Sequence, residues 1–229
     1  GYRRLGHLEY LPLPGGDRAT LYPARILAGV LSRELGPEGA VRTLASLGLI
    51  NAFPGGLQEA EAAAQGAARA PLSSSVGRFL DAVSALLGVC WARTYEGEPA
   101  QKLEAAARGG GLVDGLAFDV EGGVIITSDF LLRLAEARGR HSVRDLAYTT
   151  LFRLGEALGA VVLEAAGDLK LPAVASGGAA VNDYIVKGLK RALGAILLPK
   201  GVPAGDGGIA LGQAVIACNI YEVGRAEPP

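Results

Sequence analysis

Two glycine-rich stretches near the C-terminal end contain the residue types that a phosphate or a sugar would need. The first reads SGGAAVND at 176–183 and follows the apolar run LPAVA. Glycine lets several backbone N–H groups approach one phosphate, because no side chain stands in the way. Asn182 adds a neutral donor and acceptor suited to a sugar hydroxyl. The stretch therefore predicts either a connective turn or a phosphate and ribose contact made by Gly177, Gly178 and Asn182.

The second stretch reads AGDGGIALGQA at 204–214 and places Asp206 beside another glycine pair. A carboxylate in such a loop is able to ligate Mg²⁺ or another metal ion. It is equally able to cap the helix that follows. Both interpretations of Asp206 stay open on the sequence alone.

The elements around these stretches predict that the two loops lie at one edge of a sheet. Apolar runs and breakers indicate a strand over 171–175, a helix over 179–193, a strand over 195–199 and a helix over 209–221. Such an alternation predicts parallel strands joined by a right-handed crossover. Ligands bind at the carboxyl ends of the strands in such sheets. Both glycine pairs fall at that end.

The preceding part of the chain is predicted to be mainly helical. A partly alternating segment, 3–13, suits a strand. Helices are expected over 23–35 (stopped by Gly36-Pro37), 37–48, 57–69, 99–108 and 129–138. Serines 73–75 cap a further helix that carries Phe79, Val83, Leu86 and Leu87 on one face. Gly122-Gly123 predicts a hairpin, and Ser142 with Asp145 forms a capping box for a helix to about Gly167.

Other residues with reactive side chains each have a plain structural interpretation. Asp81 is read alone as a solvated residue on a helix face, paired with Arg78 one turn earlier. Gly97 in YEGEPA is expected to permit a turn between two helices, and His141 to lie in an exposed loop. Cys90 and Cys218 fall in apolar helix patterns and are expected to be packed thiols. A disulfide between them stays open, with a reducing cytoplasm favoured.

Composition narrows the class of protein. The 229 residues carry a net charge of −1 and are half hydrophobic, which suits one large domain or two lobes with a substantial core. No apolar run approaching a membrane span, no signal pattern and no basic block are apparent, so we expect a cytoplasmic protein that binds neither membrane nor nucleic acid. The chain starts at Gly1 and lacks methionine, which predicts a segment of a longer product.

The order of several motifs resembles one known family. LPLPGGD…YPAR (11–25), SSSVGRFLDAVSALLG (73–88), YEGEPAQKLE (95–104), SGGAAVN (176–182) and VPAGDGGIALGQA (202–214) together resemble the C-terminal, universal tRNA-modification-like (Kae1-like) domain of HypF carbamoyltransferases. This resemblance spans nearly the whole chain. The PGGD and YEGE elements distinguish it from the similar tRNA threonylcarbamoyladenosine synthase subunit.

The resemblance implies an α/β fold of the ASKHA (actin-like ATPase, RNase H-like) type, with a helical insertion and without its N-terminal lobe. It implies a mainly helical part over about 17–110 and a nucleotide-binding α/β part over 112–229. It further implies ATP or carbamoyl-AMP as ligand, with Asp81, Gly97, Gly177, Gly178 and Asn182 lining the nucleotide site. Asp206 matches a metal-ligating aspartate, for Mg, Fe or Zn. The implied activity passes a carbamoyl group to the C-terminal cysteine of HypE during [NiFe]-hydrogenase maturation.

The chain also departs from the family pattern. SGGAAVN replaces SGGVFQN, Gly205 replaces the asparagine of NDGG, and the paired-histidine metal motif lies upstream in the family. We therefore expect the metal to be shared with residues absent from this chain, and the partners to be a HypE-like acceptor and the missing N-terminal HypF segments or a separate chain. A threonylcarbamoyl-transferring subunit and a catalytically silent lobe that binds a partner remain the alternatives.

Overall fold

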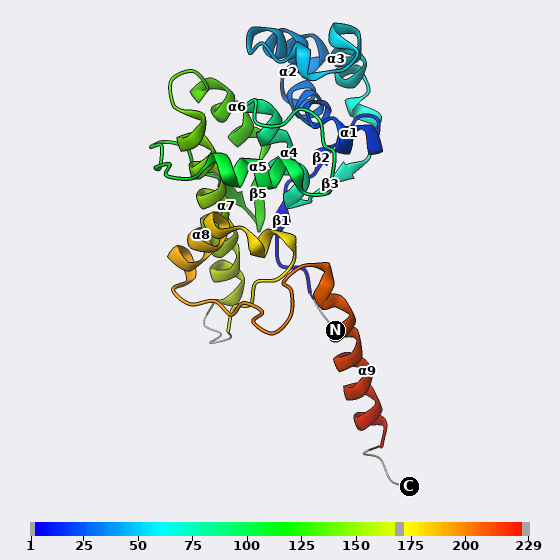
Figure 1. Cartoon of the computed structure of the whole chain (residues 1–229), viewed down its shortest axis with the longest axis vertical. Coiled ribbons are helices and arrows are strands. Elements are labelled where there is room, and N and C mark those ends of the chain that lie inside the picture. Colours follow the sequence, from blue (N-terminus) through cyan, green and yellow to red (C-terminus); the bar gives the residue numbers. More distant parts are fainter. Residues whose placement is uncertain (1–2, 168–171, 226–229) are drawn as a thin grey trace.

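The computed structural model describes residues 3–167 and 172–225, and shows a mixed α/β chain that is mostly helical (Figure 1). The helices are α1 (Asp17–Leu21), α2 (Ala24–Ser46), α3 (Gly56–Gln65), α4 (Val76–Leu86), α5 (Glu98–Ala106), α6 (Ser128–Ala137), α7 (Val143–Ala166), α8 (Asp183–Leu193) and α9 (Ile209–Arg225). The 3₁₀ turns are η1 (Ile50–Ala52), η2 (Ala67–Arg69), η3 (Gly178–Val181) and η4 (Asp206–Gly208).

The strands are short and form two small sheets. They are β1 (His7–Leu8), β2 (Leu11–Pro12), β3 (Leu72–Ser73), β4 (Asp119–Glu121) and β5 (Val124–Ile126). In one sheet β5 lies between β1, which is parallel to it, and β4, which is antiparallel. The β4–β5 hairpin turns at Gly122-Gly123, both with positive φ, as predicted. The single strand expected over 3–13 was wrong, because β1 and β2 join different sheets.

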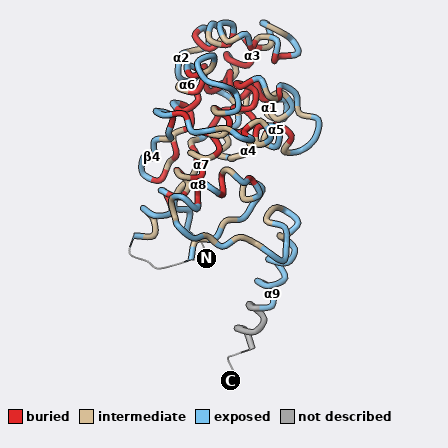
Figure 2. Tube along the Cα trace, turned by 60° about the vertical axis from the view of Figure 1, so that its left-hand side comes forward, coloured by how far each residue is buried: buried red, intermediate tan, exposed pale blue. Residues whose placement is uncertain are grey.

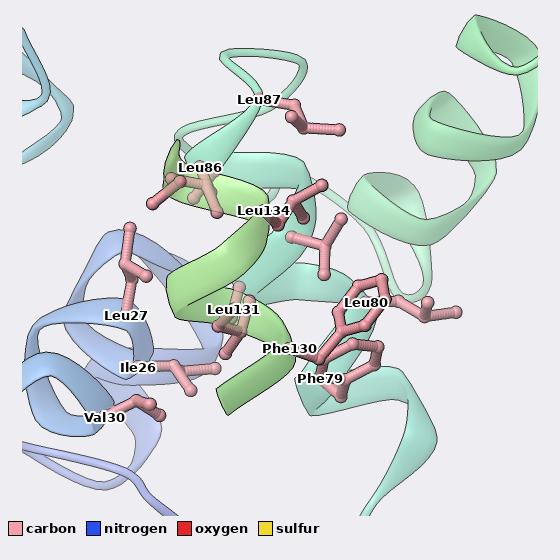
Figure 3. Packing of buried hydrophobic residues seen from close by; sticks show 14 of the residues in the cluster. Ile26, Leu27, Val30, Phe79, Leu80, Leu86, Leu87, Phe130, Leu131 and Leu134 are labelled. Atoms are coloured by element: carbon pink, nitrogen blue, oxygen red, sulfur yellow. The ribbon is translucent and has the colours of Figure 1, made fainter. Parts of the chain in front are cut away.

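The core lies among α2, α4 and α6. Figure 3 shows Ile26, Leu27 and Val30 of α2 facing leucines of α6, with Phe79 of α4 against Phe130. The Phe130 ring also stacks on Phe118 at a centroid distance of 3.9 Å. All four apolar residues predicted for one face of α4 are buried. The predicted serine cap is present, since Ser75 accepts a hydrogen bond from the backbone N–H of Arg78.

The break predicted at Gly36-Pro37, between helices over 23–35 and 37–48, is confirmed within α2. The chain leaves helical geometry at Gly36, and Pro37 opens a second helical stretch that runs to Ser46. The breaker therefore kinks the helix at the predicted position, because proline starts a helical turn as readily as it ends one.

The C-terminal strands are much shorter than predicted. A single parallel bridge joins Val174 to Leu197, with hydrogen bonds from Ala175 N to Leu197 O at 3.0 Å and from Leu197 N to Ala173 O at 2.8 Å. Residue 171, the start of the first predicted strand, lies outside the described residues. The parallel relation is confirmed, but full strands over 171–175 and 195–199 were wrong. Neither of the two sheets in the described chain includes this bridge, and Val174 and Leu197 are both more than half exposed.

Helix α7 is apolar and long enough, by length and composition, to cross a membrane. The expectation that no such stretch exists was therefore wrong. Half of its apolar window is buried within the protein, and one face packs along α8. A core helix has the same composition, because it must also be apolar on most sides. The capping box predicted for its start is present, since Ser142 accepts a hydrogen bond from Asp145 N.

Candidate functional site

The two glycine-rich stretches lie side by side. The backbone N–H of Gly177 donates a hydrogen bond to the carbonyl of Ala204 at 2.7 Å. The first stretch forms η3 and the second forms η4, and both follow the parallel bridge at the same end. A side chain at Gly178 or Gly205 would meet nothing within 4 Å. The predicted convergence of the loops is thus present. Their backbone is open at Gly178 and Gly205, whereas a Cβ at Gly207 or Gly208 would crowd Pro203.

Asn182 starts helix α8. Its side-chain oxygen accepts hydrogen bonds from the backbone N–H groups of Tyr184 at 3.1 Å and Ile185 at 3.0 Å. The residue is buried. The oxygen is therefore engaged as a helix cap, and the amide nitrogen is the part of Asn182 left to meet a sugar hydroxyl.

Asp81 is buried within the protein, not solvated. It is 1% exposed in α4, and its Oδ2 lies 2.9 Å from a guanidinium nitrogen of Arg78. The interpretation of Asp81 as a solvated face residue was wrong, although the pairing with Arg78 is confirmed. Burial raises the pKa of Asp81 to about 6, against the opposing charges of Arg78 and Arg93. Helix α4 contacts both α5 and η3, so Asp81 belongs to the helix that the first glycine loop touches.

The YEGE element turns into α5 through Gly97. Gly97 has φ 79° and occupies the N-cap position, which confirms that it permits the turn. The next residue, Glu98, is buried and accepts hydrogen bonds from the backbone and hydroxyl of Thr94 at 2.5 and 2.8 Å. Lys102 lies 2.7 Å from its other oxygen. Hydrogen bonds from Lys102 and Thr94 lower the pKa of Glu98 to about 2, so the carboxylate stays charged.

A carboxylate of α5 also holds the start of α8. Glu104 Oε1 accepts a hydrogen bond from the backbone N–H of Asp183 at 2.7 Å. A negative charge is favourable at a helix N-terminus. The contact joins the YEGEPAQKLE stretch to the SGGAAVND stretch across 79 residues of sequence. Sequence reasoning missed Glu98 and Glu104; the Glu98–Lys102 spacing signalled the first, and no local signal pointed to the second.

The structure leaves Asp206 without the partners of a complete metal site. Gly205 occupies the N-cap position of η4, so Asp206 does not cap that turn. Its carboxylate is exposed. Among the residues that the structure describes, no group of three His, Cys, Asp or Glu side chains is close enough to hold a metal ion. The residues present therefore do not fit a metal on their own, and Asp206 would require ligands from another segment.

The structure confirms the predictions for His141 and Cys90 but not the one for Cys218. His141 lies in an exposed turn, as expected. Cys90 is buried, and burial raises the pKa of its thiol. Cys218 is exposed, so the expectation of a packed thiol was wrong there. Both cysteines are free, which answers the open question of a disulfide between them.

The PGGD and YPAR motifs have a structural role in the helical part. Arg25 of YPAR is buried, and its Nε donates to the carbonyl of Pro14 at 2.8 Å. The same guanidinium pairs with Glu59 of α3. A side chain at Gly15 would collide with Arg25. These motifs therefore hold the first turn against α2 and α3, and do not line the glycine loops.

Comparisons with known proteins agree with this arrangement. Residues 1–213 match a family model described as carbamoyltransferase, Kae1-like domain, second subdomain. The chain is 34% identical over 228 residues to a carbamoyltransferase HypF of Rhizobium leguminosarum bv. viciae, covering 96% of this chain and 28% of the relative. It is 34% identical to that of Rhodobacter capsulatus, covering 97% and 29%.

Two solved structures have a similar fold. The crystal structure of T. kodakarensis HypF aligns with a TM-score of 0.80 and 33% identity, covering 96% of this chain and 30% of that one. A full-length HypF in a phosphate- and nucleotide-bound form aligns with a TM-score of 0.72 and 25% identity, covering 97% and 35%. The expected fold class is thereby confirmed. The chain spans only about a third of the length of these proteins.

Proposed function

Since this chain belongs to the HypF carbamoyltransferase family through the second subdomain of its Kae1-like domain, we propose that it supplies one wall of a carbamoyl-adenylate site. The wall consists of the two glycine loops, 176–182 and 204–208, with α4 and the start of α5 beside them. The proposal covers ATP or carbamoyl-AMP as ligand, and transfer of the carbamoyl group to the C-terminal cysteine of a HypE-like acceptor.

The observation that carries the proposal is the contact between Gly177 and Ala204. This hydrogen bond holds together two loops, 27 residues apart, in which a Cβ at Gly177, Gly178 or Gly205 would meet nothing within 4 Å. A phosphate needs several N–H donors that converge on one point. The N–H groups of Gly177 and Gly208 already donate to the carbonyls of Ala204 and Gly205, so those of Gly178 and Gly207 are the glycine donors left for a ligand. The phosphate- and nucleotide-bound form of a similar protein supports a nucleotide as the ligand.

We assign a role in the site to each of the other predicted residues. Asn182 contacts the ribose through its amide nitrogen, because its oxygen caps α8. Gly97 lets α5 begin close to the ligand. Asp81 is buried, and we assign it to the support of the site from within α4, where its carboxylate pairs with Arg78.

A divalent ion, Mg, Fe or Zn, would supply positive charge opposite the phosphates. Asp206 would provide one oxygen ligand, and a hard cation needs about six. The remaining ligands and the carbamoyl-forming chemistry belong to segments outside this chain, which spans about 30% of its relatives. The part that this chain performs by itself is to bind and orient the adenylate.

Titration of the ¹⁵N-labelled chain with ATP and with a non-hydrolysable carbamoyl-adenylate analogue tests the proposal. We expect amide shifts at Gly177, Gly178 and the second glycine loop, with dissociation constants in the millimolar range for a half-site, about −4 kcal/mol. The variant Gly178→Val should abolish these shifts while keeping the fold, because the new side chain enters open space.

The matched control is Gly111→Val, another glycine with open space around it, in a loop packed near α7. It should bind as the unchanged chain does. Absence of shifts at both glycine loops, up to about 10 mM ligand, would favour the silent partner-binding lobe over an adenylate site.

A further inference from the structure

The start of helix α8 has its first three backbone N–H groups already bonded to side chains. The side-chain oxygen of Asn182 accepts from the N–H groups of Tyr184 at 3.1 Å and Ile185 at 3.0 Å. The N–H of Asp183 donates to Glu104 Oε1 at 2.7 Å. An anion binds at a helix start through N–H groups that lack a partner there. The donors for a phosphate therefore lie in the loop before α8 and not at the helix start itself.

That loop has little packing to hold it in place. None of the residues of η3 or η4 is buried. Figure 2 shows that the buried residues concentrate around α2, α4 and α6, while the end from which α9 departs, next to η4, is mostly exposed. A segment with few buried contacts opens easily. The position of the first glycine loop therefore depends on the hydrogen bonds at its two ends.

Glu104 supplies the bond that comes from a distant part of the chain. Asn182 caps α8 from the adjoining residue, whereas Glu104 belongs to α5, 79 residues before its partner Asp183. Helix α5 packs against α4 and α7, and α8 packs along α7. The contact thus fixes the start of α8, and with it the end of the first glycine loop, relative to the helix that begins after Gly97.

The charge of Glu104 suits this role. A carboxylate is stabilised at the positive end of a helix, and a hydrogen bond to a charged acceptor is stronger than one to a neutral acceptor. The same negative charge disfavours a phosphate at the start of α8. The phosphate is thereby left to the N–H groups of the glycine loops, where Gly178 has open space beside it.

We infer that Glu104 is a positioning residue for the adenylate site. It acts through Asp183 and Asn182, and it holds the first glycine loop at a fixed place relative to the start of α5. The inference rests on the proposed function, because the loop that Glu104 positions is one of the two loops of that site.

Two variants of the ¹⁵N-labelled chain, Glu104→Ala and Glu104→Gln, test the inference with and without ATP. In the free chain, Glu104→Ala should move the amide signals of Gly177 and Gly178 and speed hydrogen exchange of the Asp183 N–H at least about tenfold. It should weaken ATP binding about fivefold, the effect of about one hydrogen bond. Glu104→Gln retains an acceptor oxygen, so it should restore the loop signals and most of the affinity.

The matched control is Asp145→Ala. Asp145 Oδ1 also accepts a hydrogen bond from a distant backbone N–H, that of Gly111, at 2.9 Å. Its loss should lower the free energy of unfolding in urea, as the loss of the Glu104 carboxylate does, but should leave the glycine-loop signals and ATP affinity unchanged.

Three results would overturn the role of Glu104. They are unchanged loop signals in free Glu104→Ala, equal movement of those signals in Asp145→Ala, and ATP binding by Glu104→Ala that is as tight as before or tighter. Failure of the unchanged chain to bind ATP would count against the adenylate proposal alone. The measurements on the free chain would then still decide whether Glu104 positions the loop.

Discussion

Gly155 of α7 and Gly188 of α8 face each other where the two helices cross. A Cβ built on either glycine would lie 2.9 Å from the Cα of the other, and would overlap a backbone carbonyl oxygen of the facing helix. The two backbones therefore touch without side chains between them. Since α8 begins at Asp183 with Asn182 as its N-cap, this contact fixes where the first glycine loop ends.

The close crossing of α7 and α8 predicts that one added methyl group at the contact lowers stability. Gly188→Ala should lower the free energy of unfolding by about 1–3 kcal/mol, because overlap with rigid backbone outweighs the gain in helix propensity of about 1 kcal/mol. Urea unfolding measures the change. Gly212→Ala in α9, where a Cβ meets nothing, should be neutral or stabilising in the same chain. Equal effects at both glycines would contradict the close crossing.

Two substitutions of Asn182 distinguish its role as the N-cap of α8 from its proposed role as a ligand contact. Asn182→Ala removes two hydrogen bonds to backbone N–H groups, and should cost about 0.5–2 kcal/mol of stability. Asn182→Ser retains a capping oxygen and should cost little. If the amide nitrogen contacts ribose, the serine variant should still weaken adenylate binding. Thermal unfolding measures the change in stability, and the ¹⁵N titration independently measures the change in adenylate binding.

The buried carboxyl of Asp81 predicts a pH-dependent stability. Its folded pKa, about 6, lies above the unfolded value of about 3.9, so the folded chain binds more protons between these values. The contribution of Asp81 is therefore most favourable at low pH and declines as pH rises through 4 to 6. Relative to the unchanged chain, Asp81→Asn should gain at most about 3 kcal/mol between pH 4 and pH 7. A pH-independent difference in urea unfolding would contradict the raised pKa.

The Arg25–Glu59 pair predicts coupling between the PGGD turn and α3. Burial raises the pKa of Glu59, but hydrogen bonds from Gly55 and Arg25 outweigh it, so the pKa lies below its usual value. Stability from this group is present above the unfolded pKa of about 4.3 and is lost as pH falls through the folded pKa. Arg25→Met should cost about 2–4 kcal/mol, with part recovered by adding Glu59→Gln.

The control for that pair is Arg42→Met, whose partner Glu38 is almost fully exposed. Removing an exposed ion pair should change stability by less than about 1 kcal/mol. Chemical unfolding of Arg25→Met, Glu59→Gln, the double variant and Arg42→Met at pH 7 provides the comparison. Strict additivity of Arg25→Met and Glu59→Gln would show that the two side chains act separately.

Much of the local structure follows from the sequence. Ser75 and Ser142 start helices, and Gly122-Gly123 turns a hairpin, because each depends on groups within a few residues. The nearness of the two glycine loops was also predictable, since consecutive parallel elements place their carboxyl ends together. The family followed from the order of motifs, no one of which is specific by itself.

Only the tertiary structure decided which side chains are buried and what they contact. Asp81 has the spacing of an exposed residue, but it is buried in α4, a helix that α2, α5 and η3 all contact. Glu104 meets Asp183, and Gly155 meets Gly188, through contacts between distant segments that leave no periodic signal in the chain. Local hydrogen bonds and helix periodicity act over a few residues, so they can be predicted from the sequence. The burial of a side chain depends on how whole helices and strands pack together, and only the folded chain determines that packing.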